Sequence, residues 1–460
     1  MEPRRIDSET DRPGPGRGSG SGRALVIEPH VRNRMPASAS ARAALRSPAA
    51  KLDEAVGLAQ AIDLEVVETG IVPVGGIRPA TFMGKGKVEE IAGLVKGAEA
   101  GIVVVDGALS PVQQRNLEKA WNAKVLDRTG LILEIFGRRA HTREGSLQVE
   151  HAHLTYQKSR LVRSWTHLER QRGGFGFLGG PGESQLETDR RLIEERISRI
   201  EDELEKVKRT RKLHRDSRKR VPYPIVALVG YTNAGKSTLF NRLTAASVLS
   251  ANMLFATLDP TLRAVALPHG SKIIVSDTVG FISDLPTMLV AAFRATLEEV
   301  VSADVILHVR DISHEDAQAQ SHDVEDVLRQ LGIEPGDGAR IIEVWNKIDR
   351  LDPQAREQVG NLAERQASER RPVRVSALSG EGISALLAEI EARLAASRTM
   401  LELTLDAADG AGISWLYRHT EVLTRVADDD AHIAMTVRAE QTQRDLVMQR
   451  FRGRVEEVVL

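Results

Sequence analysis

The sequence has no cysteine among its 460 residues and no long uninterrupted run of apolar residues. Without cysteine, the chain cannot form disulfide bonds, thiolate metal sites or a cysteine nucleophile. Without a run of about 18 apolar residues, we expect no membrane span. The N-terminus is rich in glycine, serine, proline and arginine in place of an apolar segment, so we expect no secretory signal. These absences predict a cytoplasmic protein and leave a peripheral association with membranes open.

A large net charge is absent as well, because the formal charge at pH 7 is −1. Residues 138–220 nevertheless hold 21 lysines and arginines against 13 aspartates and glutamates, which gives this segment a charge of +8. A basic segment in a nearly neutral chain favours a polyanionic partner, although a solvated helix face would give the same charge.

The most informative pattern that is present lies at residues 230–237, GYTNAGKS, which match the phosphate-binding loop G-x-x-x-x-G-K-[ST]. The apolar run 225–229 predicts a buried strand before the loop, and 238–243 predict a helix after it. Such a loop turns its N–H groups toward an anion, while Lys236 reaches the β- and γ-phosphates and the Ser237 hydroxyl binds Mg²⁺. The predicted phosphate contacts are Gly230, Tyr231, Thr232, Asn233, Ala234, Gly235, Lys236 and Ser237.

Three shorter motifs follow downstream and predict that the nucleotide is GTP. After the apolar strand 272–276, Asp277 suits water-mediated binding of Mg²⁺, and the Gly280 N–H suits the γ-phosphate. After the strand 340–344, Asp349 can accept two hydrogen bonds from the guanine N1 and N2 donors, both of which adenine lacks. The third motif, at 376–378, predicts a loop at the base O6. The predicted contacts in these motifs are Asp277, Thr278, Val279, Gly280, Asn346, Lys347, Ile348, Asp349, Ser376, Ala377 and Leu378.

Composition and periodicity predict a multidomain chain of the α/β class. We expect a disordered leader, a small parallel α/β domain, a basic helical hairpin, a Ras-like GTPase domain with helices on both faces of a parallel-rich sheet, and a small α+β appendage. Their predicted bounds are 1–22, 23–137, 138–220, 221–397 and 398–460. Within the first folded domain, strands are predicted at 24–27, 65–67 and 101–105, and helices at 87–98 and 110–122, where Ser110 and Pro111 suit N-cap and N1. In the appendage, strands at 401–405 and 432–437 flank a helix predicted near 413–427.

The hairpin is predicted from two seams of apolar residues. Leucine recurs every seven residues at 147, 154, 161 and 168, and apolar residues at 193, 197, 200, 204 and 207 alternate in steps of four and three. Two antiparallel helices that pack on each other explain both seams without a dimer, so we expect a monomer. The glycine-rich tip between them, residues 173–182, carries Phe175 and Phe177, which suit insertion into a groove or stacking on bases. The second helix ends in the basic stretch 206–220, which RNA phosphates would neutralise.

Several further motifs make the chain resemble the HflX-type GTPases over roughly residues 23–450. These motifs are Pro79–Glu90, Leu109–Leu117, Asp127–Gly130, Gly180–Glu183, Glu187–Arg191 and Phe255–Pro260. The resemblance implies a translation-factor-like GTPase that binds the 50S ribosomal subunit and its rRNA. It also implies that the N-terminal domain and the hairpin approach the peptidyl transferase centre, and that the protein splits stalled ribosomes under stress.

In the family pattern, Thr257 is the switch I threonine, which binds Mg²⁺ when GTP is bound; the nucleotide contacts of this segment are Phe255, Ala256, Thr257, Leu258 and Asp259. Phe281 stands where many GTPases have a glutamine that orients the attacking water, so we expect slow intrinsic hydrolysis. Help would come from the ribosome, or from K⁺ bound at Asn233, which resembles the asparagine of potassium-activated GTPases. The expected catalytic residues are therefore Lys236, Thr257, Gly280 and Asn233.

Two other functions remain open at this point. An RNA-remodelling NTPase would bind ATP in the N-terminal domain, where Gly84-Lys85-Gly86-Lys87 lacks the spacing and the hydroxyl residue of a second phosphate-binding loop but can still contact phosphate. A nucleotide-gated signalling adaptor would instead use the hairpin to bind a protein.

Overall fold

The computed structural model describes residues 22–31, 46–169, 185–218, 223–244, 254–255, 261–284, 294–367, 370–396, 399–427, 432–439 and 441–458. Residues 1–21 of the predicted leader and the glycine-rich tip lie outside these ranges. The chain divides into two compact units. Unit 1 comprises Met1–Lys212, Asn252–Asp259 and Asp284–Phe293, and unit 2 comprises Leu213–Ala251, Pro260–Ser283 and Arg294–Leu460.

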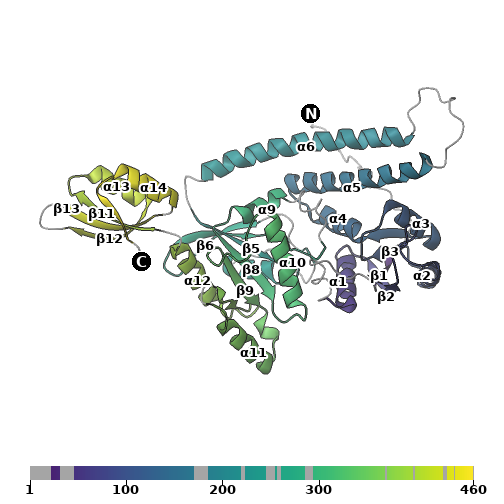
Figure 1. Cartoon of the computed structure of the whole chain (residues 1–460). Coiled ribbons are helices and arrows are strands. Elements are labelled where there is room, and N and C mark those ends of the chain that lie inside the picture. Colours follow the sequence, from purple (N-terminus) through teal and green to yellow (C-terminus); the bar gives the residue numbers. More distant parts are fainter. Residues whose placement is uncertain are drawn as a thin grey trace, which may run out of the picture. The chain divides into compact units, whose positions relative to one another are not determined.

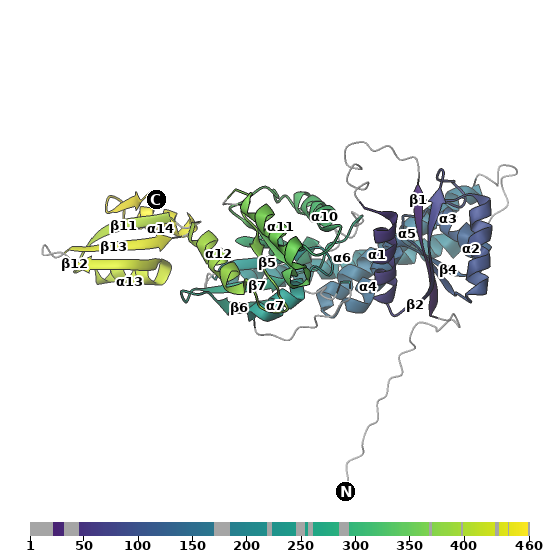
Figure 2. The same ribbon diagram turned by 90° about the horizontal axis from the view of Figure 1, so that it is seen from below.

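Unit 1 begins with a four-stranded sheet in the order β2-β1-β3-β4, in which every strand pair is parallel (Figure 1). Figure 2 shows α1 on one face of this sheet and α2 on the other. The elements are β1 (Arg23–Val31), α1 (Pro48–Gln60), β2 (Glu65–Val74), α2 (Lys85–Gly97), β3 (Ile102–Val105), α3 (Pro111–Trp121), β4 (Lys124–Asp127) and α4 (Arg128–Arg139). The predicted parallel α/β domain is therefore confirmed, and Ser110 caps α3 in a capping box with Pro111 in its first turn.

A network of buried charges lies at the carboxyl end of this sheet. Arg128 donates from its two terminal nitrogens to Asp106 and Glu54, at 2.5 Å each, and Arg46 donates to the other oxygen of Glu54 at 3.1 Å. Glu28 is 4 % exposed, and the charge of Asp106 acts on it. Burial, with the charge of Asp106 second, raises the pKa of Glu28 to about 8.

The hairpin is formed by α5 (Arg143–Glu169) and α6 (Gln185–Arg218). Figure 1 shows the two helices side by side, and ion pairs in antiparallel register join them. The ion pairs are Arg143–Glu203, Glu150–Arg196 and Lys158–Glu194, and His151 shares a hydrogen bond with Glu201 at 3.2 Å. Leu147 and Ile200, one from each predicted seam, are buried. The described residues therefore confirm the two packed helices.

Asp127 fastens α5 to the sheet of unit 1. Its carboxylate caps α4 through the Gly130 N–H at 2.8 Å, and it accepts the Tyr156 hydroxyl and the Arg160 guanidinium at 2.5 Å each. Burial, together with the negative charge of Asp127, raises the pKa of Tyr156. The Asp-Arg-Thr-Gly motif thus joins the sheet, α4 and the hairpin.

The first part of unit 2 is a six-stranded sheet in the order β10-β9-β8-β5-β7-β6, in which only β6 is antiparallel to its neighbour. This arrangement agrees with the predicted parallel-rich GTPase sheet. Its elements are β5 (Ile225–Gly230), α7 (Lys236–Thr244), β6 (Thr261–Ala266), β7 (Lys272–Asp277), α9 (Arg294–Val301), β8 (Val305–Asp311), α10 (Ala317–Gln330), β9 (Ile341–Asn346), η2 (Ile348–Arg350), α11 (Pro353–Glu364), β10 (Val373–Arg374) and α12 (Ile383–Ala396).

The C-terminal part is an antiparallel sheet in the order β12-β13-β11-β14, covered on one face by α13 and α14 (Figure 1). Its elements are β11 (Thr399–Asp406), α13 (Gly410–His419), β12 (Glu421–Ala427), β13 (His432–Ala439), α14 (Gln441–Arg450) and β14 (Val455–Val458). The helix predicted near 413–427 was too long. It ends at His419, and the β-branched residues that follow form β12.

No helix among the described residues combines the length and the apolar character that crossing a membrane requires.

Candidate functional site

The phosphate-binding loop joins the carboxyl end of β5 to the N-terminus of α7, as the sequence predicts. Two glycines are required by its shape. A Cβ on Gly230, whose φ is +153°, would lie 2.2 Å from the carbonyl oxygen of Val309. A Cβ on Gly235, at φ +92°, would lie 2.3 Å from the side-chain nitrogen of Asn346. The loop therefore passes too close to its neighbours to carry side chains at these positions.

Lys236 is held inside the loop. Its ammonium group donates to the carbonyl oxygens of Gly230 at 3.1 Å and Tyr231 at 2.8 Å, and the residue is 6 % exposed. Burial lowers the pKa of Lys236 to about 8, against the opposing effect of the Asp277 carboxylate. An anionic phosphate next to this amine would favour its charged form.

Ser237 and Asp277 supply oxygen ligands suited to Mg²⁺. The Ser237 hydroxyl donates to the Asp277 carboxylate at 2.8 Å, and Asp277 is fully buried at the end of β7. A hydroxyl and a carboxylate beside a phosphate-binding helix N-terminus are the hard oxygen donors that Mg²⁺ prefers. These residues therefore fit the ion.

The base-recognition motif is tied to the phosphate loop through Asn346. Its side-chain nitrogen donates to Ala234 O at 2.8 Å, and its oxygen accepts the N–H of Ala377 at 3.0 Å. Lys347, at φ +65°, pairs with Asp311 at 2.7 Å. Asp349 is exposed and so is accessible to a base.

The third motif is held by contacts of its own. Ser376 is fully buried, and its hydroxyl accepts the N–H of Ser379 at 3.0 Å. Arg242 of α7 donates to Ala377 O at 3.1 Å, whereas the side chain of Leu378 is 73 % exposed. Sequence reasoning missed Arg242 and Asp311. The position of Asp311 at the end of a buried strand is a signal that could have identified it.

The segment after Asp277 is paired with the phosphate loop by its backbone. Phe281 N–H donates to Gly230 O at 3.1 Å, and Thr232 N–H donates to Phe281 O at 2.7 Å. The Tyr231 hydroxyl accepts the N–H of Ser283 at 2.9 Å. Gly280 lies close to Lys236, since a Cβ added to Gly280 would be 3.0 Å from Lys236 Nζ. The side chain of Phe281 is 1 % exposed.

The predicted nucleotide residues at 230–237, 277–280, 346–349 and 376–378 are thus all in unit 2. Asn233 is exposed in the left-handed conformation, at φ +59°. The switch I residues Ala256, Thr257, Leu258 and Asp259 lie outside the described residues. Phe255 is described and belongs to unit 1, where its ring packs against Phe136.

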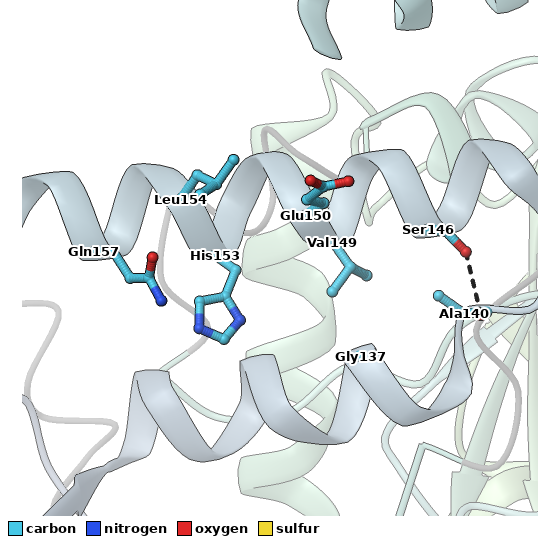
Figure 3. A pocket seen from close by; sticks show the side chains of 8 residues that line it. All are labelled: Gly137, Ala140, Ser146, Val149, Glu150, His153, Leu154 and Gln157. Atoms are coloured by element: carbon cyan, nitrogen blue, oxygen red, sulfur yellow. Dashed lines mark hydrogen bonds between the residues drawn. The ribbon is translucent and has the colours of Figure 1, made fainter. Parts of the chain in front are cut away.

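Two other features lie apart from this site. Gly84 is the N-cap of α2, and Lys85 and Lys87 of its first turn pair with Glu89 at 3.7 Å and Glu90 at 2.6 Å, which partly neutralises them. A hollow of about 310 Å³ lies between α4 and α5, and Figure 3 shows His153 and Gln157 pointing from α5 toward α4. Its other lining residues are Gly137, Ala140, Ser146, Val149, Glu150 and Leu154. None of them belongs to a nucleotide motif.

Comparison with known proteins gives matches over most of the chain. Four sequence profiles match in order: GTP-binding GTPase N-terminal at 49–137, GTP-binding GTPase middle region at 139–218, 50S ribosome-binding GTPase at 225–347, and HflX C-terminal domain at 361–457. The chain is 53 % identical to GTPase HflX of Magnetococcus marinus, over 81 % of this chain and 84 % of that protein. It is 46 % identical to GTPase HflX of Escherichia coli, over 78 % and 83 % of the two chains.

Proposed function

Because the chain belongs to the HflX family of GTPases, we propose that its GTP hydrolysis is coupled to the 50S ribosomal subunit and that it separates the subunits of stalled ribosomes. GTP binding and hydrolysis follow from the family. The observation that supports the coupling to the ribosome is the match of residues 225–347 to 50S ribosome-binding GTPases, together with a basic hairpin that lies outside a generic GTPase domain.

In the proposed site, the loop amides and Lys236 bind the phosphates, and Asp349 recognises guanine. Mg²⁺ would be held by Ser237, by Thr257 and, through water, by Asp277, and it would neutralise the charge that develops on the phosphates. The protein's own contribution is positional. The backbone pairing of Phe281 with the phosphate loop holds Gly280 close to Lys236. From there the Gly280 N–H can donate a hydrogen bond to the γ-phosphate.

We propose that intrinsic hydrolysis is slow because no side chain at position 281 can orient water. Phe281 has no polar atom, and its ring is buried. The missing assistance would come from the ribosome, or from K⁺ held by Asn233. In P-loop GTPases, charge supplied at this point is worth about 10³–10⁵ in rate.

We also assign the hairpin as the rRNA-binding element. Within the described residues, three ion pairs and the His151–Glu201 hydrogen bond join α5 to α6. Phosphate contacts from the basic stretch at 206–220 would make binding to the 50S subunit weaken steeply as salt rises.

The direct test is GTP turnover by the full chain in KCl, with and without purified 50S subunits. We expect at least tenfold stimulation by 50S and its loss in Lys236→Ala. A rate that does not change with 50S would contradict ribosome coupling and favour the signalling adaptor. ATP turnover that survives Lys236→Ala would favour a second nucleotide site in the N-terminal domain.

Two further measurements separate the parts of the proposal. Equal turnover in NaCl and KCl would contradict a role for K⁺ at Asn233. Light scattering of 70S ribosomes with GTP tests subunit separation. If the 50S subunit stimulates GTP turnover but the scattering does not change, subunit splitting is contradicted and the coupling of hydrolysis to the 50S subunit is not.

A further inference from the structure

The loop that carries Ala377 and Leu378 is held from the side of α7 by one arginine. Arg242 lies in the last turn of α7, the helix that begins with Lys236 of the phosphate-binding loop. Its Nε donates to Ala377 O at 3.1 Å, and its Nη2 donates to Leu378 O. A Cβ added at Gly380 would lie 3.7 Å from Arg242 Cζ, so the guanidinium also lies against the turn that follows. All of these residues belong to unit 2.

Two N–H groups of this loop already have an acceptor within the protein. The Ala377 N–H donates to Asn346 Oδ1 at 3.0 Å, and the Ser379 N–H donates to the Ser376 hydroxyl at 3.0 Å. Among the residues that the structure describes, the Leu378 N–H has no acceptor. Leu378 is also exposed, at 73 %. Its N–H is therefore the donor of this loop that a ligand can use.

The contact with Arg242 determines which way the Leu378 N–H points. The carbonyl of Ala377 and the N–H of Leu378 belong to one peptide, and a trans peptide carries its C=O and its N–H on opposite sides. Because Arg242 holds the carbonyl on the α7 side, the N–H faces away from α7. The guanidinium always carries its charge, and a carbonyl bonded to it makes the N–H of the same peptide a stronger donor.

We propose that Arg242 is a positioning residue for guanine recognition, because it holds the Leu378 N–H ready to donate to O6 of the base. Adenine has an amino donor where guanine has this acceptor, so an N–H held there favours guanine. Asp349 reads the N1 and N2 donors of the same base, and Arg242 adds a second source of specificity through O6. The inference rests on the proposed guanine site formed by Asp349 and the loop at 376–378.

The consequence of losing Arg242 follows from the freedom of the loop. Without the guanidinium, two carbonyls lose a charged donor, and the peptide between Ala377 and Leu378 is free to rotate. A donor that faces O6 for only part of the time lowers the affinity by that fraction. The loss is felt only by a nucleotide whose base accepts a hydrogen bond at position 6.

The test compares three nucleotides bound to the full chain with Mg²⁺, by titration calorimetry. GDP carries O6, N1–H and the 2-amino group. IDP lacks only the 2-amino group, which Asp349 reads, and keeps O6. In 6-thio-GDP a sulfur, which is a weak acceptor, replaces O6, while N1–H and the 2-amino group remain.

Arg242→Met removes the donors and keeps an apolar stem. We expect it to weaken GDP and IDP at least fivefold and by the same factor, and 6-thio-GDP less than twofold. Retained binding of 6-thio-GDP also shows that the variant is folded. Arg365→Met, at the exposed end of α11, is the matched control and should change none of the three affinities.

Three results would overturn the proposal. Equal weakening of all three nucleotides would mean that Arg242 only stabilises the domain, and unchanged GDP binding would mean that the loop holds its position without it. Equal binding of GDP and 6-thio-GDP by the parent chain would mean that O6 is not read. Failure of the guanine site itself looks different, because the parent chain would then bind ADP as tightly as GDP. None of these measurements uses the 50S subunit, so a failure of ribosome stimulation would be seen separately.

Discussion

The side chain of Asn346 donates to the carbonyl oxygen of Ala234 at 2.8 Å, across 112 positions of sequence. Its oxygen accepts the N–H of Ala377 at 3.0 Å, and the residue is 1 % exposed. One buried amide therefore connects the phosphate loop, the base-recognition motif and the loop at 376–378. Because its orientation is fixed from both sides, Asn346 sets the spacing between the phosphate-binding and base-binding halves of the site.

Asn346→Asp should weaken GTP and GDP equally. The substitution places a second oxygen opposite Ala234 O, which loses a buried hydrogen bond worth about 1–3 kcal/mol, or about 5- to 150-fold in affinity. Titration calorimetry with each nucleotide measures this loss. Asn361→Asp on the exposed face of α11 is the control and should change neither affinity. Loss confined to GTP would show that Asn346 acts on the γ-phosphate side instead.

The sequence motif around Asn346 predicts a guanine site, but it does not reveal this bracing role. Both partners of Asn346 are main-chain atoms. A main-chain hydrogen bond does not depend on the side chain of the partner residue, so the sequence does not show which residues Asn346 contacts. The same limit applies to Phe281, where the sequence shows that a glutamine is missing and only the structure shows that the side chain is buried.

Phe281→Gln should not accelerate hydrolysis. The position is 1 % exposed and its backbone is paired to Gly230 and Thr232, so a glutamine there would place its amide in the apolar core. Burying an unpaired amide costs about 1–3 kcal/mol, which lowers the melting temperature of a domain of this size by roughly 2–12 °C. We expect a lower Tm and an unchanged or lower intrinsic rate. Phe281→Leu, which keeps the site apolar, should lower Tm less. A faster rate in the glutamine variant would mean that position 281 can reach the attacking water.

The N-terminal domain illustrates what local patterns reveal. Ser110 and Pro111 predict where α3 begins, because capping depends on neighbouring residues. Residues 421–427 were instead predicted as helix, but they form a strand. Their conformation depends on pairing with β13, a partner that the local sequence does not specify. The charged network around Arg128 is likewise assembled from separate elements, and the Asp127–Gly130 motif does not reveal that its arginine pairs with Glu54 and Asp106.

Glu28 should make the protein less stable as pH rises. Its pKa is raised from 4.5 to about 8 in the folded state, so folding favours the protonated form. The stability that this group contributes is fully present below pH 4.5 and is lost as the pH rises toward 8. Glu28→Gln keeps a neutral hydrogen-bond donor toward Asp106 and should be more stable relative to the parent at pH 8 than at pH 5.

Urea unfolding at pH 5 and pH 8 measures this difference. Glu68→Gln, at an exposed position of β2, is the control and should show the same pH dependence as the parent chain. If Glu28→Gln and the parent lose stability in parallel between the two values, the folded protein does not hold Glu28 protonated.

His308 should make the protein less stable as the pH falls, which is the opposite of the effect of Glu28. It lies on β8 and is 3 % exposed, and burial lowers its pKa from 6.5 to about 4. The unfolded chain therefore takes up a proton below pH 6.5 that the folded chain does not, and stability falls as the pH drops from 6.5 toward 4. His308→Gln, which cannot titrate, should lose less stability than the parent between pH 7 and pH 5, whatever its stability at pH 7. His30→Gln, at the exposed end of β1, should follow the parent. Equal losses in the His308 variant and the parent would mean that the folded state accommodates the imidazolium, which would require Glu343 on the neighbouring strand to neutralise it.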